Sequence, residues 1–490
     1  MQIVTRRLAL ISSFLAALAL GGCLGNSGSA QPAPTGVQLY AGDAAVSVVW
    51  NDDPLINYWL FYAQDPTVSP LAISQETSML NVGVVEPAFS PVILCNGARL
   101  VVNNYPATDP SFPAIYVTIN GRTGTAKGGP GSAPVSALPR AAGGPNVPWV
   151  SGASIPARIN AMGYVPLSTC GYAGGPPEGI FVAVGPSATV YASTLAPAVA
   201  GPLTNPGNVT MAWTQGNVPL GFNENLNAVG GRSTGAPSAP NLLFAAVGDN
   251  GAILHSYDGQ NWSRSNNVPT SVNLHDVTYA ASAFVAIGDN GVVLTSADAV
   301  TWTVNQSAQL ANPSATALRA IHCVASSCLI VGDAGTTMWS STGGANWTLM
   351  THGANNWIAA AYGNADANRD AVVSHPNGSV TITTSNEAIG TWVIVDALGN
   401  YAYFNGSTAS AWADGATTIA PGIVAIDYTS NFIALDKAGN AWLSENGSTD
   451  AWATYGAAPV AANGASAVAL HSNGQGFVAM GSAGANAANF

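Results

Sequence analysis

Residues 243–251, LFAAVGDNG, join an apolar run to a Gly-Asp-Asn-Gly turn, and this combination recurs twice further along the chain. The copies are AFVAIGDNG at residues 283–291 and CLIVGDAG at residues 328–335, and their first turn glycines, Gly248, Gly288 and Gly332, step by 40 and 44 residues. A period of this length, with four short strands per unit, is typical of a β-propeller in which each unit forms one blade. Only a closed ring of blades buries both faces of every sheet.

A second motif follows each copy: a serine, a turn, and a tryptophan six residues after the serine. More degenerate copies step by 40 residues from Asp396 to Asp436, and an early copy at residues 180–185 precedes Trp213 after an insertion. The motif residues are Ser256, Asp258 and Trp262, then Ser296, Asp298 and Trp302, then Ser341 and Trp347, with Trp392, Trp412 and Trp452 in the later copies.

These strings resemble the Asp-box or BNR repeats of sialidase-like propellers, and more closely the propeller of the photosystem II assembly and stability factor family. In such boxes Ser and Asp tie down the hairpin between the third and fourth strands and Trp packs between blades, so the resemblance implies a structural role for the motif residues. We expect Asp249 and Asp289 in tight turns rather than calcium loops, because Asn-Gly supplies the positive φ angles that such turns require. Asp333 is the matching residue of the third copy. The arginine patch with which that family holds its partner is not visible in this arginine-poor chain, so the partner is not carried over.

The repeats also predict the number of blades. First-strand candidates lie near Ile159, Leu226, Leu274, Leu318, Ile358, Ile423 and Val468, which predicts an all-β, seven-bladed propeller over residues 158–490. Six blades remain an alternative, and eight would follow if Trp392 and Trp412 belonged to different sheets. The last unit lacks its tryptophan strand, which residues 146–150 in the linker 138–157 could supply, closing the ring.

The N-terminal residues predict export and anchoring. Residues 1–22 place two arginines before an apolar run and small residues, which is the pattern of a signal peptide. The sequence LGGC that ends at Cys23 resembles the lipobox of bacterial lipoproteins, in which the cysteine is lipidated; an ordinary secretory signal is the alternative. Residues 23–35 read as a flexible tether, and Leu24 is compatible with sorting to the outer membrane. We therefore expect a lipid-anchored protein of the bacterial cell envelope.

Between tether and linker, residues 36–137 alternate strands and turns. VSVVW at residues 46–50 and NYWLFY at residues 57–62 resemble the opening of a fibronectin type III domain, in which a tryptophan closes one strand and a tyrosine-rich strand packs over it. Leu100 stands where that family often has its corner tyrosine, so the resemblance does not assign the middle strands. The resemblance implies an N-terminal fibronectin type III-like sandwich.

Export permits disulfides, and the cysteines beyond Cys23 form an even set: Cys95, Cys170, Cys323 and Cys328. Cys323 and Cys328 bracket four residues and would face each other across a hairpin, within the reach of a disulfide. Cys95 and Cys170 then pair only by elimination. Zinc binding, with His322 beside Cys323, is disfavoured because the usual spacing of soft ligands is absent, and no metal or cofactor is expected.

Charge and motif content restrict the function. Beyond residue 22 the chain carries 10 basic and 24 acidic side chains, a net charge of −14, which disfavours nucleic-acid binding. A sialidase needs three arginines around the carboxylate of its substrate, but the arginines here fall at unlike positions in their repeats, and no catalytic motif is recognisable. Glu224 and Glu387 are candidate glycosidase carboxylates only because a propeller loop could direct them inward. The sequence favours a non-enzymatic binding or scaffold protein that contacts a protein or glycan, and the alternative is a sialidase-like or other glycan-acting hydrolase.

Overall fold

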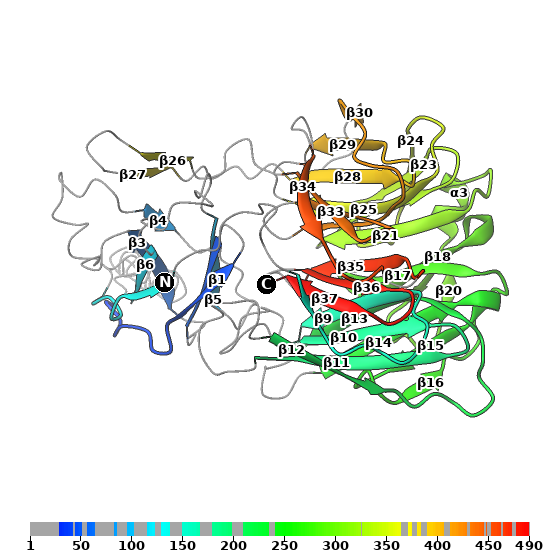
Figure 1. Ribbon diagram of the computed structural model, residues 1–490, viewed down its shortest axis with the longest axis horizontal. Helices are drawn as coiled ribbons and strands as arrows, with labels where there is room; N and C mark the ends of the chain where they lie inside the picture. Colours follow the sequence, from blue (N-terminus) through cyan, green and yellow to red (C-terminus); the bar gives the residue numbers. More distant parts are fainter. Residues whose placement is uncertain are drawn as a thin grey trace, which may run out of the picture.

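The computed structural model describes most of the chain from residue 29 onward. The N-terminal part is described at residues 29–42, 45–50, 56–63, 83–85, 96–101, 115–122 and 129–137. The C-terminal part is described at residues 149–166, 179–197, 209–234, 241–324, 326–363, 371–374, 380–383, 390–405, 412–428, 432–444, 447, 452–461, 464–472 and 477–489. In these ranges the chain forms a ring of sheets and two smaller N-terminal sheets (Figure 1).

The ring contains seven four-stranded antiparallel sheets, which confirms the predicted seven-bladed propeller. Each blade runs outward from its first strand. Blade 1 holds β9 (Ala161–Pro166), β10 (Gly179–Gly185), β11 (Thr189–Pro197) and β12 (Val209–Gln215); blade 2 holds β13 (Leu226–Thr234), β14 (Asn241–Gly248), β15 (Ile253–Ser256) and β16 (Trp262–Arg264); blade 3 holds β17 (Leu274–Ala280), β18 (Ala283–Gly288), β19 (Val293–Ser296) and β20 (Thr303–Val304); blade 4 holds β21 (Leu318–Val324), β22 (Ser327–Gly332), β23 (Thr336–Ser340) and β24 (Thr348–Thr351).

The remaining blades follow the same order, with two additions. Blade 5 holds β25 (Trp357–Gly363), β28 (Thr391–Asp396), β29 (Tyr401–Asn405) and β30 (Ala413–Asp414), and the hairpin β26 (Ala371–Ser374) and β27 (Val380–Thr383) is inserted after its first strand; blade 6 holds β31 (Ile423–Tyr428), β32 (Phe432–Asp436), β33 (Asn440–Ser444) and β34 (Ala453–Ala457); blade 7 holds β35 (Ala467–Ser472), β36 (Phe477–Gly481), β37 (Asn486–Asn489) and β8 (Val150–Ser151).

The ring is closed by pairing its two ends. Strand β8 precedes blade 1 in sequence but pairs antiparallel with β37, so the segment after the linker supplies the outer strand of blade 7. Trp149, immediately before β8, packs edge-on against Tyr455 of blade 6 at a ring separation of 6.5 Å. Every pair of neighbouring blades shares one apolar cluster of described residues, and each cluster contains a tryptophan from an outermost strand or just before it: Trp149, Trp213, Trp262, Trp302, Trp347, Trp412 and Trp452.

Trp392 has a different position from the one predicted for it. It lies on β28, the second strand of blade 5, and is fully buried against Phe404 and Tyr362. Trp412 precedes β30 of the same sheet, so both tryptophans belong to one blade and the eight-blade alternative is wrong. Trp392 fills the centre of its sheet, because a second strand is covered on both faces.

The serine and aspartate of the second motif hold the turn between third and fourth strands. In blade 2 the buried Ser256 hydroxyl accepts from Gly259 N–H at 2.9 Å, and Asp258 Oδ1 accepts from the N–H groups of Gln260 and Asn261 at 2.8 and 2.7 Å. The Trp262 indole donates to Gly259 O at 3.0 Å. Blade 3 repeats this pattern with Ser296, Asp298 and Trp302.

In blade 4 the turn is held by Ser340, not by the predicted Ser341. The Ser340 hydroxyl accepts from Gly344 N–H at 3.0 Å and from Thr342 N–H at 3.2 Å, and Ser340 pairs with Cys328 as Ser256 pairs with Phe244. Ser341 is exposed. The turn before Trp347 is one residue longer than in blades 2 and 3, so counting back six residues from the tryptophan identifies the wrong serine.

The disulfide between Cys323 and Cys328 is formed, as predicted, with the two Cα atoms 4.1 Å apart. It joins β21 and β22 near their hairpin, where Val324 and Ser327 pair as well, so the loop is shorter than the four residues expected. Cys23, Cys95 and Cys170 lie outside the described residues, and their lipidation and pairing stay predictions.

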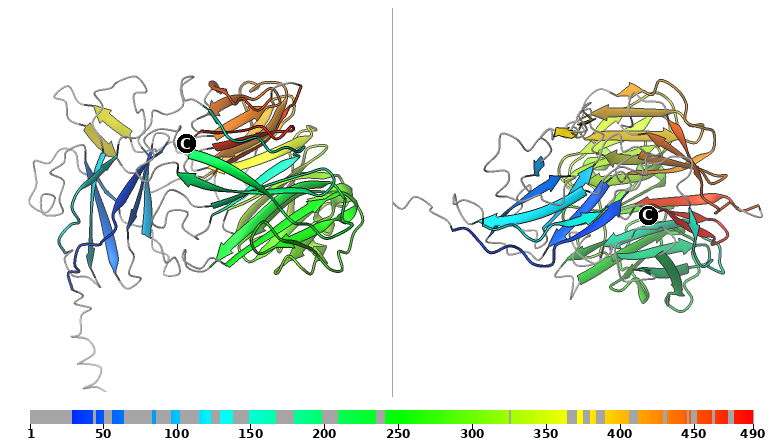
Figure 2. Two further views of the ribbon diagram at one scale, coloured as in Figure 1. Left: turned by 60° about the horizontal axis from the view of Figure 1, so that its bottom comes forward. Right: turned by 60° about the vertical axis from the view of Figure 1, so that its left-hand side comes forward.

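The N-terminal part forms two antiparallel sheets. One has the order β1 (Gln38–Gly42), β2 (Ala45–Trp50), β5 (Asn96–Val101), and the other has the order β4 (Gly83–Val85), β3 (Asn57–Ala63), β6 (Ile115–Arg122), β7 (Val135–Ala137). These sheets lie on one side of the propeller (Figures 1 and 2), and α3 (Gln306–Ala311) lies on the side away from them in Figure 1. Among the described residues, no helix has the length and apolar character needed to cross a membrane.

Candidate functional site

The inner strands of the blades line a central channel of about 430 Å³. Each first strand enters the ring at the end that carries the turns between second and third strands and the connections from one blade to the next. We call this end the mouth face, and the opposite end, with the serine-aspartate turns and the disulfide, the base face. A channel through a rigid ring, surrounded by loops, is a common place for recognition.

A β-bulge occurs at the same position of the inner strand in six blades. In each of them one residue is skipped between the strand's first two paired residues. A bulge redirects the extra side chain, and here the skipped residues line the channel at the mouth. They are Asn227, His275, Arg319, Ile358, Val424 and Val468, and Asn160 lines the channel just before β9 of blade 1.

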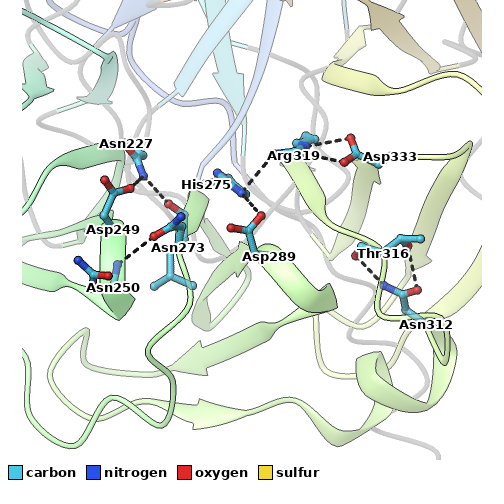
Figure 3. Close-up of polar contacts among 11 residues, drawn as sticks. Asn227, Asp249, Asn250, Asn273, His275, Asp289, Asn312, Thr316, Arg319 and Asp333 are labelled. Atoms are coloured by element: carbon cyan, nitrogen blue, oxygen red, sulfur yellow. Dashed lines mark hydrogen bonds and ion pairs between the residues drawn. The ribbon is translucent and has the colours of Figure 1, made fainter.

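One half of this ring is polar and tied to the neighbouring turns (Figure 3). Asn227 Nδ2 donates to Asp249 Oδ1 at 2.8 Å, and His275 Nε2 lies 2.7 Å from Asp289 Oδ1. Arg319 makes a two-pronged ion pair with Asp333 at 2.9 and 2.5 Å. Arg319 Nη1 also lies 3.3 Å from His275 Nε2, which links two of these pairs.

These contacts add a second role to the turn aspartates. The turns themselves have the expected backbone, with φ of 55° at Asn250 and 71° at Gly251. A Cβ on Gly251 would lie 2.2 Å from Thr270 O, so only glycine fits there. The carboxylate of Asp249, however, accepts from the side chains of Asn225 and Asn227 rather than from its own turn. The sequence motif identified the turn but missed the link to the mouth.

The other half of the ring is apolar. Ile358, Val424 and Val468 follow one another in blades 5, 6 and 7 and line the same channel. The mouth face also carries the three most exposed large apolar side chains among the described residues: Leu220 at 106%, Leu310 at 83% and Leu398 at 70%. They lie in the connection into blade 2, in α3 before blade 4, and in the turn before β29 of blade 5.

Just below the mouth the channel is lined mainly by alanine side chains, with one acidic residue among them. In the six bulged blades the residue after the bulge is alanine except in blade 3, where it is Asp276. Asp276 Oδ1 accepts from Val277 N–H at 2.8 Å, and its Oδ2 accepts from Ile321 N–H of blade 4 at 2.9 Å. Burial raises the pKa of Asp276 to about 6, although these two hydrogen bonds and the nearby His471 lower it.

Two residues deeper, the channel carries His322, Asp427 and His471 from blades 4, 6 and 7. Asp427 braces two blades as Asp276 does, accepting from Tyr428 N–H and from Ser472 N–H of blade 7, both at 2.7 Å. His471 Nδ1 lies 3.5 Å from Asp427 Oδ2. Burial lowers the pKa of His322, and the charge of Asp427 opposes this shift. His322 has no hydrogen bond to any residue that the structure describes; its ring contacts Trp392 edge-on.

Of Glu224 and Glu387, the two carboxylates considered for catalysis, only Glu224 is described, and it is not part of this cluster. Glu224 pairs with Arg264 at 3.0 Å in the connection before blade 2 and does not line the channel. Partial burial raises the pKa of Glu224, but hydrogen bonds from the backbone N–H groups of Glu224 and Asn223, together with the ion pair, outweigh it and hold the pKa below its usual value. Glu387 lies outside the described residues. Among the described residues, no group of three or more His, Cys, Asp or Glu side chains is arranged to hold a metal ion.

No protein-family model and no curated protein matches the chain. Among solved structures it is similar to "YCF48 bound to D1 peptide", at 15% identity and a TM-score of 0.46, covering 70% of this chain and 94% of the other. YCF48 from Cyanidioschyzon merolae gives 13% and 0.45, covering 70% and 98%, and the WD40 β-propeller domain of Doa1 gives 8% and 0.44, covering 69% and 96%. At these identities the likeness concerns the fold alone.

Proposed function

We propose that this chain is a non-catalytic binding protein whose propeller docks a protein partner on the mouth face. The observation that carries the proposal is the position of Leu220, Leu310 and Leu398, which are the most exposed large apolar side chains described and lie on one face around the channel mouth. They stand singly on three separate connections, and loops on a scaffold of strands are where recognition residues are commonly found. The paired polar groups and the apolar half of the mouth between them provide both kinds of contact that protein interfaces use.

A hydrolase is the weaker candidate because the channel carboxylates are engaged by the fold. Catalysis of glycoside cleavage needs two carboxyl groups placed on either side of the scissile bond, one to donate a proton and one to act as base or nucleophile. Asp276 and Asp427 each use both oxygens to accept backbone N–H groups of two adjacent blades. Their hydrogen bonds join blades and do not direct an acid-base pair at one point.

Site-specific photo-crosslinking tests the docking face. A photoreactive residue at Leu310 or Leu398 should crosslink the partner in the producing cells, whereas one at Tyr257, which is 61% exposed on the base face, should not. A Leu310→Ser and Leu398→Ser double variant should lose the crosslink formed at a third mouth-face site, Leu220. Equal crosslinking at Tyr257, or turnover of a glycoside that depends on Asp427, would contradict the proposal.

We also propose that the protein is lipid-anchored through Cys23 in the bacterial cell envelope, at the outer membrane. The LGGC sequence after an apolar signal supports this. If it is correct, a Cys23→Ser variant leaves the membrane fraction for the soluble one; retention in the membrane pellet to the parental extent would refute it.

The N-terminal sheets, with strand orders β1-β2-β5 and β4-β3-β6-β7, support a fibronectin type III-like spacer between the anchor and the propeller.

A further inference from the structure

The central channel is the part of the molecule whose chemistry the docking proposal leaves unused. Its volume of about 430 Å³ lies within the range of about 300 to 1,000 Å³ typical of ligand-binding cavities. Alanine follows the bulge in five of the six bulged blades, and glycine occupies the next channel level at Gly163 and Gly230. Small side chains at these levels leave the space open.

The charge in this space is negative. Asp276 and Asp427 lie on different blades at successive levels, and the other two titratable groups at these levels are His322 and His471. Burial lowers the pKa of His322, and His471 Nδ1 lies 3.5 Å from Asp427 Oδ2. Among the described residues that line the channel, Arg319 is the one lysine or arginine, and it is paired with Asp333 at the mouth, so no further lysine or arginine faces the two carboxylates.

His322 is an independent sign of a ligand. It lies deep in the propeller, is partly accessible from the channel that it faces, and makes no hydrogen bond to a described residue, so its ring nitrogens are open to a guest. A neutral imidazole presents one nitrogen that accepts a hydrogen bond. Its neighbours across the channel are carboxylates, which accept hydrogen bonds as this nitrogen does, so a guest that donates several hydrogen bonds could bond to both.

The mouth permits a positive group to enter. The mouth is surrounded by three aspartates, Asp249, Asp289 and Asp333. Arg319, which also lies at the mouth, is held in the two-pronged ion pair with Asp333. Arg319 is thereby neutralised at close range, while Asp249 has only the uncharged Asn225 and Asn227 as side-chain partners. Arg319 therefore repels an entering cation only weakly. The three aspartates and Arg319 together give the mouth a net negative field.

We propose that the channel binds a single positively charged group, the ammonium or guanidinium of a lysine or arginine side chain, which the docked protein partner inserts from the mouth. The group donates to Asp427 and to His322, and the carboxylate of Asp276 lies along its path. This inference rests on the proposed docking function and names the chemistry of the partner.

The test uses a small probe in place of the partner. Agmatine presents a guanidinium on an aliphatic chain, and butyrate is the matched anion. Isothermal titration of the full chain at pH 7.5 should show saturable binding of agmatine and none of butyrate. Asp427→Asn should weaken agmatine at least about tenfold, which corresponds to about 1.4 kcal/mol. Asp414→Asn, which changes a carboxylate whose side chain is 82% exposed outside the channel, should not.

A second variant protects the test against misfolding, because Asp427 also braces two blades. Ala425→Leu fills the channel two residues before Asp427 on the same strand without removing a charge, and it should abolish agmatine binding with an unchanged far-UV spectrum. Absence of saturable agmatine binding, equal binding of butyrate, or full affinity in a folded Ala425→Leu variant would overturn the inference. Crosslinking at Leu310 that persists while agmatine fails to bind would leave the docking function standing and reject only the channel site.

Discussion

Replacing Ser340 and Ser341 separately by alanine gives the sharpest test of how the blades are held. Ser340 is buried, and its hydroxyl accepts from the N–H groups of Thr342 and Gly344, whereas Ser341 is exposed beside it. Alanine at residue 340 leaves two turn donors without this acceptor. Alanine at residue 341 removes no hydrogen bond that the structure shows.

The expected magnitude follows from the cost of an unsatisfied buried polar group, about 1 to 3 kcal/mol. For a domain of this size each kcal/mol moves the melting temperature by about 2 °C, so Ser340→Ala should melt about 2 to 6 °C lower than the parent. Ser341→Ala should stay within about 0.5 kcal/mol, as is usual for surface substitutions. Ser256→Ala, at the equivalent position of blade 2, should match Ser340→Ala.

Differential scanning calorimetry of the four proteins at one pH and one scan rate is the assay, with far-UV circular dichroism to confirm that each is folded. The reasoning would be refuted if Ser341→Ala lowered the melting temperature as much as Ser340→Ala. It would also fail if Ser340→Ala melted with the parent, because the turn would then not depend on the serine hydroxyl.

Three further predictions concern the ring, the disulfide and pH. Trp149→Ala should destabilise the protein by about 2 kcal/mol, roughly half the cost of removing a fully buried tryptophan, since Trp149 is only partly buried against Tyr455; urea unfolding that matches the parent would show that ring closure does not depend on it. Reducing the bond between Cys323 and Cys328 should cost about 2 kcal/mol, because it closes a very short loop; calorimetry with and without dithiothreitol measures this, and a much larger loss would contradict the loop-entropy argument. The pKa of Asp276 is raised from 3.8 to about 6, so between these values the folded chain keeps a proton that the unfolded chain has lost, and this residue lowers stability by up to about 3 kcal/mol as pH rises from 4 to 6. An Asp276→Asn variant should lack that contribution, and identical pH dependence of unfolding in variant and parent would count against it.

Much of the fold followed from the repeats. The seven first-strand positions, the strand that closes the ring and the Cys323–Cys328 pair were all readable, because each depends on spacing along the chain or on a missing member of a repeat. Two assignments failed for a local reason. Ser341 was chosen by counting from Trp347, and a one-residue longer turn displaced the count; Trp392 was grouped with the motif tryptophans although it lies on a second strand.

The candidate site was less accessible to sequence reasoning. One signal was present: aligned on their bulges, the first strands read Asn-Ala, His-Asp and Arg-Ala in blades 2 to 4, so the acidic residue of blade 3 interrupts a row of alanines. That alignment depends on the bulge, which shifts every following side chain by one position and is visible only in the pairing of the strands.

A propeller of seven repeated units is predictable from the chain alone, because strand length, turn residues and the tryptophan between blades are local properties that each repeat carries. What those units enclose depends on how the blades assemble. Asp276, His322, Asp427 and His471 come from four different blades and from positions that no motif marks. They meet because ring closure directs one side chain of every inner strand to a common axis, and a distance across that axis has no counterpart in the spacing of residues along the chain.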